Sequence, residues 1–114
     1  MLGGVLKLSK DVSIELDEDG FLKDPNKWNA EVATYIAREQ FGIELEDIHL
    51  KVVRFFLEYY QKWGTLPMIR TVRTNLNLTS EKLDELFKRK NSTARGVICK
   101  ISGLPKLLCM AAGC

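Results

Sequence analysis

The sequence predicts a mainly helical, single-domain protein with a small β-hairpin at the N-terminus and an arm at the C-terminus. A length of 114 residues, with 46% hydrophobic and 28% charged residues, suits one globular core and is too short for two. Apolar residues alternate with polar ones near the N-terminus, and farther along they recur at helical spacing. We therefore expect one domain over 1–114, divided into a hairpin (5–16), a helical body (26–103) and an arm (104–114).

The hairpin is predicted from two short alternating segments, 5–8 and 12–16, on either side of a polar stretch. A two-stranded hairpin is not stable alone, so the helical body must cover its apolar face. The acidic segment 17–20 then turns the chain, and Phe21 and Leu22 return it to the interior.

The body begins with two helices, at about 30–40 and 46–63. Asn29 is the candidate N-cap of the first helix, and Gly42 stops it. The second helix has a wide apolar and aromatic face, so we expect it to be the central rod of the core, and Gly64 ends it. The inward residues are Val32, Ala33, Ile36 and Ala37 in the first helix, and Ile48, Val52, Phe55, Phe56, Tyr59, Tyr60 and Trp63 in the second.

Three shorter helices follow. Pro67 suits the first helical position of one, Thr79 caps the next, and Ser92 or Thr93 caps the last. The two helices that flank residues 75–78 resemble the outline of a helix-turn-helix, although crossed short helices are also common in small bundles for packing reasons alone. The inward residues are Ile69, Val72 and Leu76, then Leu83, Leu86 and Phe87, then Val97, Ile98 and Ile101.

The arm is predicted from a stop signal and from its composition. Gly103 ends the last helix, and Pro105 prevents that helix from resuming. Residues 106–114 are mostly small or apolar and include no acidic residue. We expect an arm that folds over the body yet can be released, because chain ends are poorly ordered unless something ties them down.

All three cysteines, Cys99, Cys109 and Cys114, lie in the last sixteen residues. An odd number of cysteines argues against a structural disulfide framework and leaves redox, sulfur-transfer or metal chemistry. Metal binding is the weakest of these, because the only histidine, His49, lies far upstream and no Cys-x-x-Cys pair is present. We expect neither a metal nor a cofactor.

The C-terminal quarter of the chain is strongly basic. Residues 86–114 contain six Lys or Arg and no Asp or Glu, so 11 basic and 15 acidic residues remain in 1–85, a net charge of −4. Nearby cations stabilise a thiolate, which predicts lowered cysteine pKa values; the alternative is a solvated basic end without a role.

Each cysteine has a chemical and a passive interpretation. Cys114 either enters another protein's active site, unobstructed by a side chain at Gly113, or is a passive terminal thiol. Cys99 lies on the last predicted helix, fifteen residues before Cys114. Either the segment between them loops back so that the two cysteines form a disulfide, or Cys99 packs in the core. Cys109 either competes for this pairing or is a small buried apolar residue. Lys100 either helps to hold a Cys99 thiolate or is merely exposed.

Two candidates lie outside the arm. His49, in the first turn of the long helix, is interpreted as a packing residue rather than a base, because nothing places it near the cysteines in sequence. Arg70 is assigned either to a functional surface or to an ordinary surface salt bridge.

Several motifs stand out between residues 12 and 106. They are Asp17-Glu18-Asp19-Gly20-Phe21-Leu22-Lys23-Asp24-Pro25-x-x-Trp28-Asn29, Ile43-Glu44-Leu45 with His49 four places on, Tyr59-Tyr60, Pro67-x-Ile69-Arg70, Leu86-Phe87 and Cys99-Lys100-Ile101-x-Gly103-Leu104-Pro105-Lys106. Together they resemble the DsrC/TusE family, which comprises the gamma subunit of dissimilatory sulfite reductase and the TusE sulfur relay proteins of transfer RNA thiolation. The resemblance implies a small orthogonal helical bundle with an N-terminal β-hairpin and a mobile C-terminal arm.

The resemblance also implies a sulfur carrier rather than a self-sufficient enzyme. Cys114 matches the near-terminal cysteine that carries the sulfur, and Cys99 matches the cysteine that joins it in a disulfide or trisulfide in the sulfite reductase branch. The arm departs from the family pattern, because Leu107 replaces a proline and the two cysteines are 15 residues apart where the family has about eleven. Cys109, at a spacing of 10, is therefore an alternative carrier.

The implied partners are sulfite reductase catalytic subunits or sulfurtransferases of a sulfur relay. The alternative from another class is a nucleic-acid-binding regulator, in which the helix-turn-helix-like helices and the basic end bind nucleic acid and the cysteines form a redox switch. No apolar run is long enough to span a bilayer, and the N-terminus lacks the features of a signal peptide. We therefore expect a cytoplasmic protein without membrane partners.

Overall fold

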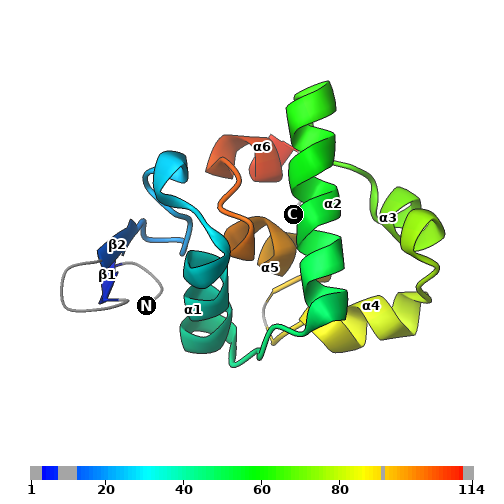
Figure 1. The fold of residues 1–114 in the computed structure, drawn as a ribbon, viewed down its shortest axis with the longest axis horizontal. Helices are drawn as coiled ribbons and strands as arrows, with labels where there is room; N and C mark the ends of the chain where they lie inside the picture. Colours follow the sequence, from blue (N-terminus) through cyan, green and yellow to red (C-terminus); the bar gives the residue numbers. More distant parts are fainter. Residues whose placement is uncertain (1–3, 8–12, 91, 112–114) are drawn as a thin grey trace.

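A computed structural model describes residues 4–7, 13–90 and 92–111 of the chain. This part contains a two-stranded hairpin, one 3-10 helix and six α-helices, which confirms the predicted mainly helical fold (Figure 1). The elements are β1 (Gly4–Lys7), β2 (Ser13–Leu16), η1 (Pro25–Lys27), α1 (Ala30–Phe41), α2 (Asp47–Trp63), α3 (Ile69–Leu76), α4 (Ser80–Phe87), α5 (Ala94–Ile101) and α6 (Lys106–Ala111).

The core surrounds α5, the helix that leads into the arm. α5 packs against α1, α2 and α4, and six of its side chains or backbone positions are buried. α2 is the long central helix, with α1 on one side of it and α3 and α4 on the other (Figure 1). Large buried side chains come from several helices, among them Phe56 of α2, Phe87 of α4, and Ile98 and Ile101 of α5.

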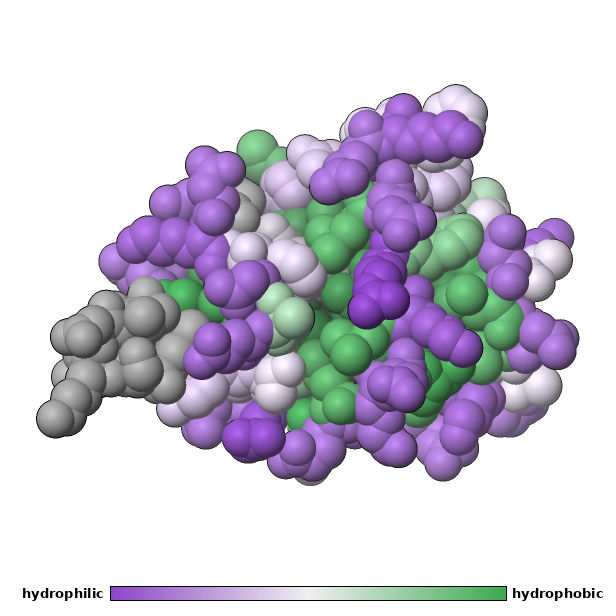
Figure 2. Space-filling view, in the orientation of Figure 1, coloured by the Kyte–Doolittle hydropathy of each residue, from purple (hydrophilic) through white to green (hydrophobic). Residues whose placement is uncertain are grey.

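The outer surface alternates between polar and apolar areas. Charged and polar side chains cover most of the face shown in Figure 2, and apolar side chains reach the surface on both sides of α2. The prediction that Trp63 faces inward is wrong, because this last residue of α2 is exposed, as is Met68. Single exposed apolar side chains are normal on a small domain and need no partner to explain them.

The hairpin covers one end of the helical body, as predicted. Ile14 and Leu16 of β2 are buried in the core. Asp17 closes the following turn, because its Oδ1 accepts hydrogen bonds from the backbone N–H groups of Asp19 (2.8 Å) and Phe21 (3.0 Å). The antiparallel pairs are Gly4 with Leu16, Val5 with Glu15, Leu6 with Ile14, and Lys7 with Ser13.

The helix ends confirm most of the predicted caps. The side chains of Asn29, Thr79 and Thr93 each accept a hydrogen bond from the backbone N–H group three residues later, over 2.8, 3.1 and 3.0 Å. Gly42 and Gly64 end α1 and α2 in the left-handed conformation, with φ of 64° and 71°. These ends depend on local chemistry, which is why the sequence predicts them.

The start of α3 corrects one prediction, which places Pro67 at the first helical position. The helix begins at Ile69, with Met68 as its N-cap. The carbonyl of Pro67 instead accepts a hydrogen bond from Nη2 of Arg95 in α5 (3.0 Å). A contact from a distant helix, which no local pattern reveals, therefore helps to hold Pro67 outside α3.

The arm contains a helix that the sequence does not predict. α6 begins directly after Pro105, and the N–H of Cys109 donates a hydrogen bond to the carbonyl of Pro105 (3.2 Å). Pro105 follows the end of α5 and also suits the start of a new helix, where its missing N–H would be unsatisfied in any case. The short helix η1 at Pro25 is likewise not predicted.

His49 caps α2, which confirms its interpretation as a packing residue. It is buried, its Nδ1 accepts a hydrogen bond from the N–H of Glu46 (3.0 Å), and its ring packs edge-on against Phe87 with the centroids 5.2 Å apart. Burial lowers the pKa of His49, and the charges of Arg89 and Lys82 add to this effect. A backbone hydrogen bond with Leu86 and the charge of Glu46 oppose it in part.

We expect the protein to lose stability as the pH falls from about 7.5 to about 5.5. The pKa of His49 is lower in the folded chain than its ordinary value of 6.5, so the unfolded chain binds more protons in this range and acid favours unfolding. Protonation also removes the Nδ1 acceptor from the cap. Urea denaturation at a series of pH values measures the slope.

The matched control for this prediction is His49→Gln, because glutamine is favoured at this position of a capping box and does not titrate. This variant should keep α2 capped and flatten the pH dependence. An equal slope in both proteins would show that another group governs the effect.

Candidate functional site

The arm leaves the body at a junction between Trp28 and the segment 101–105. Trp28 Nε1 donates a hydrogen bond to the carbonyl of Ile101, the last residue of α5 (2.8 Å). Gly103 follows with a positive φ of 66°, and a β-carbon placed on it would lie 2.6 Å from Trp28 Cδ1. The indole ring therefore lies directly against the backbone where the arm begins.

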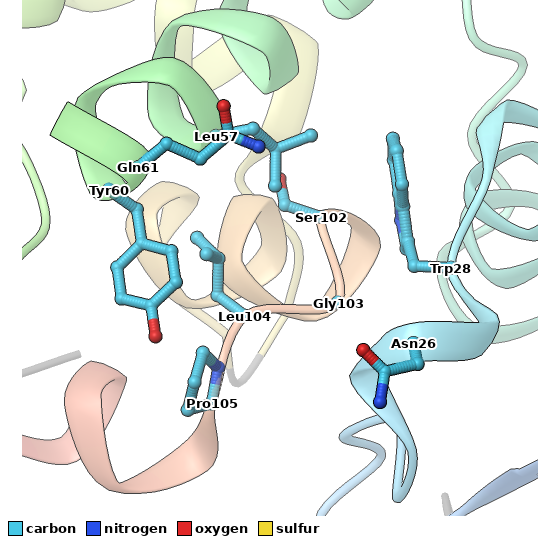
Figure 3. A pocket seen from close by; sticks show the side chains of 9 residues that line it. All are labelled: Asn26, Trp28, Leu57, Tyr60, Gln61, Ser102, Gly103, Leu104 and Pro105. Carbon is cyan, nitrogen blue, oxygen red and sulfur yellow. The ribbon is translucent and has the colours of Figure 1, made fainter. Parts of the chain in front are cut away.

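A cavity of about 370 Å³ lies beside this junction (Figure 3). Trp28 and Tyr60 lie on opposite sides of it, and the segment 102–105 passes between them (Figure 3). Ser102 Oγ is buried and has no hydrogen-bond partner within the described part of the chain. None of the lining residues carries a charge, so the cavity suits a neutral group better than an ion. Its other lining side chains are those of Asn26, Leu57 and Gln61.

Cys99 lies on α5 and is fully buried, with 0% exposure. Burial raises the pKa of its thiol to about 12, although the charges of Arg95 and Lys100 partly oppose this. The expected lowering of the cysteine pKa is therefore wrong for Cys99, because desolvation of the thiolate outweighs the nearby cations. In the folded protein at neutral pH, Cys99 is a protonated thiol and a poor nucleophile.

Cys109 lies on α6, where its side chain is also buried. Its sulfur is disulfide-bonded, whereas Cys99 retains a thiol. Gly113 and Cys114 lie outside the described residues, so the roles assigned to them stay predictions.

α6 is held on the body by a small set of contacts. Lys106 forms an ion pair with Asp19 in the turn after β2, which raises the pKa of Lys106 and lowers that of Asp19. Leu108 packs against the core, but Leu107 is 81% exposed. Because an exposed ion pair adds little stability, α6 is held on the body mainly by its buried apolar side chains.

The basic side chains have different partners in the fold. Lys100 places its ammonium group 5.4 Å from the centre of the Phe21 ring. Arg89 and Arg95 donate hydrogen bonds to backbone carbonyls of the body. Arg70 is exposed on α3, on the other side of α2 from α6 (Figure 1). The basic C-terminal quarter is therefore spread over the fold.

Sequence reasoning did not single out Trp28 and Tyr60 as site residues. Trp28 meets Ile101 across 73 residues of sequence, a contact that no local pattern predicts. The available signal was an aromatic residue in the otherwise polar stretch 24–29.

Two kinds of feature are absent from the described residues. No helix among them has both the length and the apolar character that a membrane span requires. Within the same ranges, no three His, Cys, Asp or Glu side chains gather closely enough to hold a metal ion.

Comparison with known proteins points to one family. A family model described as "DsrC like protein" matches residues 9–110. The chain is 34% identical over 97 residues to the "Sulfite reductase, dissimilatory-type subunit gamma" of Nitratidesulfovibrio vulgaris, covering 85% of this chain and 90% of that protein. It is 36% identical over 103 residues to the "Sulfurtransferase TusE" of Escherichia coli, covering 82% of this chain and 88% of that protein.

Solved structures agree with the sequence matches. The oxidised gamma-subunit of the dissimilatory sulfite reductase (DsrC) from Archaeoglobus fulgidus superposes with a TM-score of 0.77 at 31% identity, covering 90% of this chain and 96% of that chain. The DsrC/gamma subunit of Pyrobaculum aerophilum gives a TM-score of 0.75 at 34% identity, covering 91% of each chain. These matches extend over nearly the whole fold.

Proposed function

This chain belongs to the DsrC-like protein family, and we propose that it is a sulfur carrier that holds sulfur on Cys114 as a persulfide. In the loading step, the Cys114 thiolate takes the outer sulfur of a donor persulfide, and the donor leaves as a thiol. The protein then presents this sulfur to a partner. The family match and the named relatives favour this function over the nucleic-acid-binding alternative.

The geometry of the arm root is the observation that carries the proposal. Trp28 holds the backbone of 101–103 firmly against the body. Beyond Pro105, α6 is attached mainly through α5, one exposed ion pair and part of its apolar face. A carrier needs a rigid body that a partner can recognise and a tethered thiol that can reach the partner's active site. The fixed arm root, with Cys114 eleven residues beyond Gly103 in the sequence, supports such a role.

We propose as partners the catalytic subunits of a sulfite reductase or the sulfurtransferases of a cytoplasmic sulfur relay. The relatives that support this are named as a sulfite reductase subunit and as TusE. The carrier itself acts as a co-substrate rather than as an enzyme. Because the sulfur is bound covalently, this role needs no cofactor or metal.

Incubation of the reduced protein with a persulfide donor is expected to add about 32 Da for each sulfur taken up. Intact mass spectrometry measures the addition. Cys114→Ala should abolish it, whereas Cys99→Ala should retain it, because Cys99 is buried and its thiol stays protonated.

Three results would contradict the assignment in different ways. Uptake that survives in Cys114→Ala but is lost in Cys109→Ser would make Cys109 the carrier. Uptake that is lost only in Cys99→Ala would move the function into the core. No uptake in any variant, together with salt-sensitive binding to duplex DNA, would favour the regulator.

A further inference from the structure

We propose that Cys109 is the resolving cysteine of this arm: it displaces the sulfur from Cys114 and closes a disulfide within the arm. The family resemblance assigns this part to Cys99. The proposal rests on the proposed function, because it concerns the step that follows sulfur loading. It identifies a further reacting residue that lies outside the family motif.

The position of Cys99 makes it a poor resolving residue. It is 0% exposed on a helix that α1, α2 and α4 surround. Its backbone is also tied to the arm root, since the N–H of Leu104 donates a hydrogen bond to the carbonyl of Cys99 (3.2 Å). A partner sulfur can reach this thiol only if the core opens around α5, which costs a large part of the stability of a small domain.

Exposing the Cys109 thiol requires a smaller rearrangement of the fold than exposing the Cys99 thiol. The Cys109 side chain is buried on α6, a helix of six residues that contacts α5. Leu107 of this helix is 81% exposed, and the ion pair from Lys106 to Asp19 lies at the surface. Exposing Cys109 thus requires α6 to move away from the body, whereas exposing Cys99 requires the opening of the helices that surround α5.

The tether lengths favour the same pairing. Cys109 precedes Cys114 by five residues, and Cys99 precedes it by fifteen. The effective concentration of two tethered groups falls with about the three-halves power of the tether length, which favours the shorter loop by about fivefold. The structure also distinguishes the two residues, since the Cys109 sulfur is disulfide-bonded and Cys99 is a thiol.

The step is balanced in atoms and electrons without an added oxidant. The Cys109 thiolate attacks the inner sulfur of the Cys114 persulfide, the bond between the two persulfide sulfurs breaks, and hydrosulfide leaves with that electron pair. The proton released from Cys109 accounts for the second hydrogen of hydrogen sulfide. The outer sulfur is thereby reduced to sulfide, and the two cysteine sulfurs are oxidised to a disulfide. A dithiol reductant then restores the carrier.

The test follows sulfide release from protein loaded by a persulfide donor, in wild type, Cys109→Ser and Cys99→Ala. Release should fall at least about tenfold in Cys109→Ser, while Cys99→Ala should stay within about twofold of wild type. Circular dichroism confirms that each variant is folded. Normal release from Cys109→Ser, or loss of release only in Cys99→Ala, would overturn the proposal.

A second measurement needs neither a variant nor sulfur loading. Reduced wild-type protein is oxidised with a small excess of hydrogen peroxide and digested without reduction. Mass spectrometry then identifies the peptides that contain a disulfide, within one peptide or between two. We expect a link between Cys109 and Cys114, with Cys99 recovered as a thiol. A link to Cys99 would refute the resolving role of Cys109. A protein that takes up no sulfur yet forms the expected link would refute the carrier function alone.

Discussion

Replacing Gly103 with alanine should lower the free energy of unfolding by about 2–5 kcal/mol, the largest effect that we expect from any single substitution at the arm root. Two causes add. The positive φ of 66° disfavours any residue with a β-carbon, and that carbon would also lie 2.6 Å from Cδ1 and 3.0 Å from Cγ of Trp28. The indole cannot move aside freely, because its Nε1 is hydrogen-bonded to the carbonyl of Ile101.

Gly42→Ala is the matched control for this substitution. Gly42 has nearly the same backbone conformation, with φ of 64°, but a β-carbon there would meet no atom within 4 Å. Gly42→Ala should therefore lower the free energy of unfolding by about 1 kcal/mol, because only the backbone conformation is disfavoured. Urea denaturation of both variants measures the difference. Equal losses would show that Trp28 yields without cost and that the junction is not rigid.

Cys99 should react with iodoacetamide at least about a thousandfold more slowly in the folded protein than in the unfolded chain. Its pKa of about 12, against an ordinary value of 9.0, reduces the thiolate population by this factor at neutral pH, and burial blocks the reagent as well. The experiment uses a Cys109→Ser and Cys114→Ser double variant, so that Cys99 is the only thiol. Mass spectrometry follows the labelling over time.

The same double variant in concentrated urea provides the unfolded reference rate. Rapid labelling of the folded protein would mean that the core opens readily around α5. That outcome would restore Cys99 as a partner for Cys114 and would weaken the role proposed for Cys109. The measurement therefore tests the burial on which the choice between the two cysteines depends.

Most of the helical framework could be predicted because its signals are local. The caps at Asn29, Thr79 and Thr93 and the stop at Gly42 each depend on groups within a few residues of one another. The same holds for the hairpin, whose alternation places Ile14 and Leu16 on the buried face.

The errors in the helical framework have a common origin. Pro67 lies outside α3, where a side chain from α5 binds its carbonyl. α6 forms in a segment with no strong helix signal, where Leu108 and Cys109 pack against the body. In both places, a tertiary contact outweighs or supplements a weak local preference.

The site was predicted in part. The cysteines and the arm drew attention through their clustering, and the motifs from Asp17 to Lys106 identified the family. The contact between Trp28 and Gly103 and the cavity beside it could not be predicted, because they join segments that are far apart in the sequence.

The amino-acid sequence by itself determined the fold class and the family, because periodicity, caps and motifs are properties of neighbouring residues. Only the tertiary structure decided the chemical state of Cys99. A thiol beside Lys100 and near Arg95 looks activated in the sequence, yet enclosure by α1, α2 and α4 removes the water that a thiolate needs. Desolvation depends on what the rest of the chain places around a residue, and that information is not local.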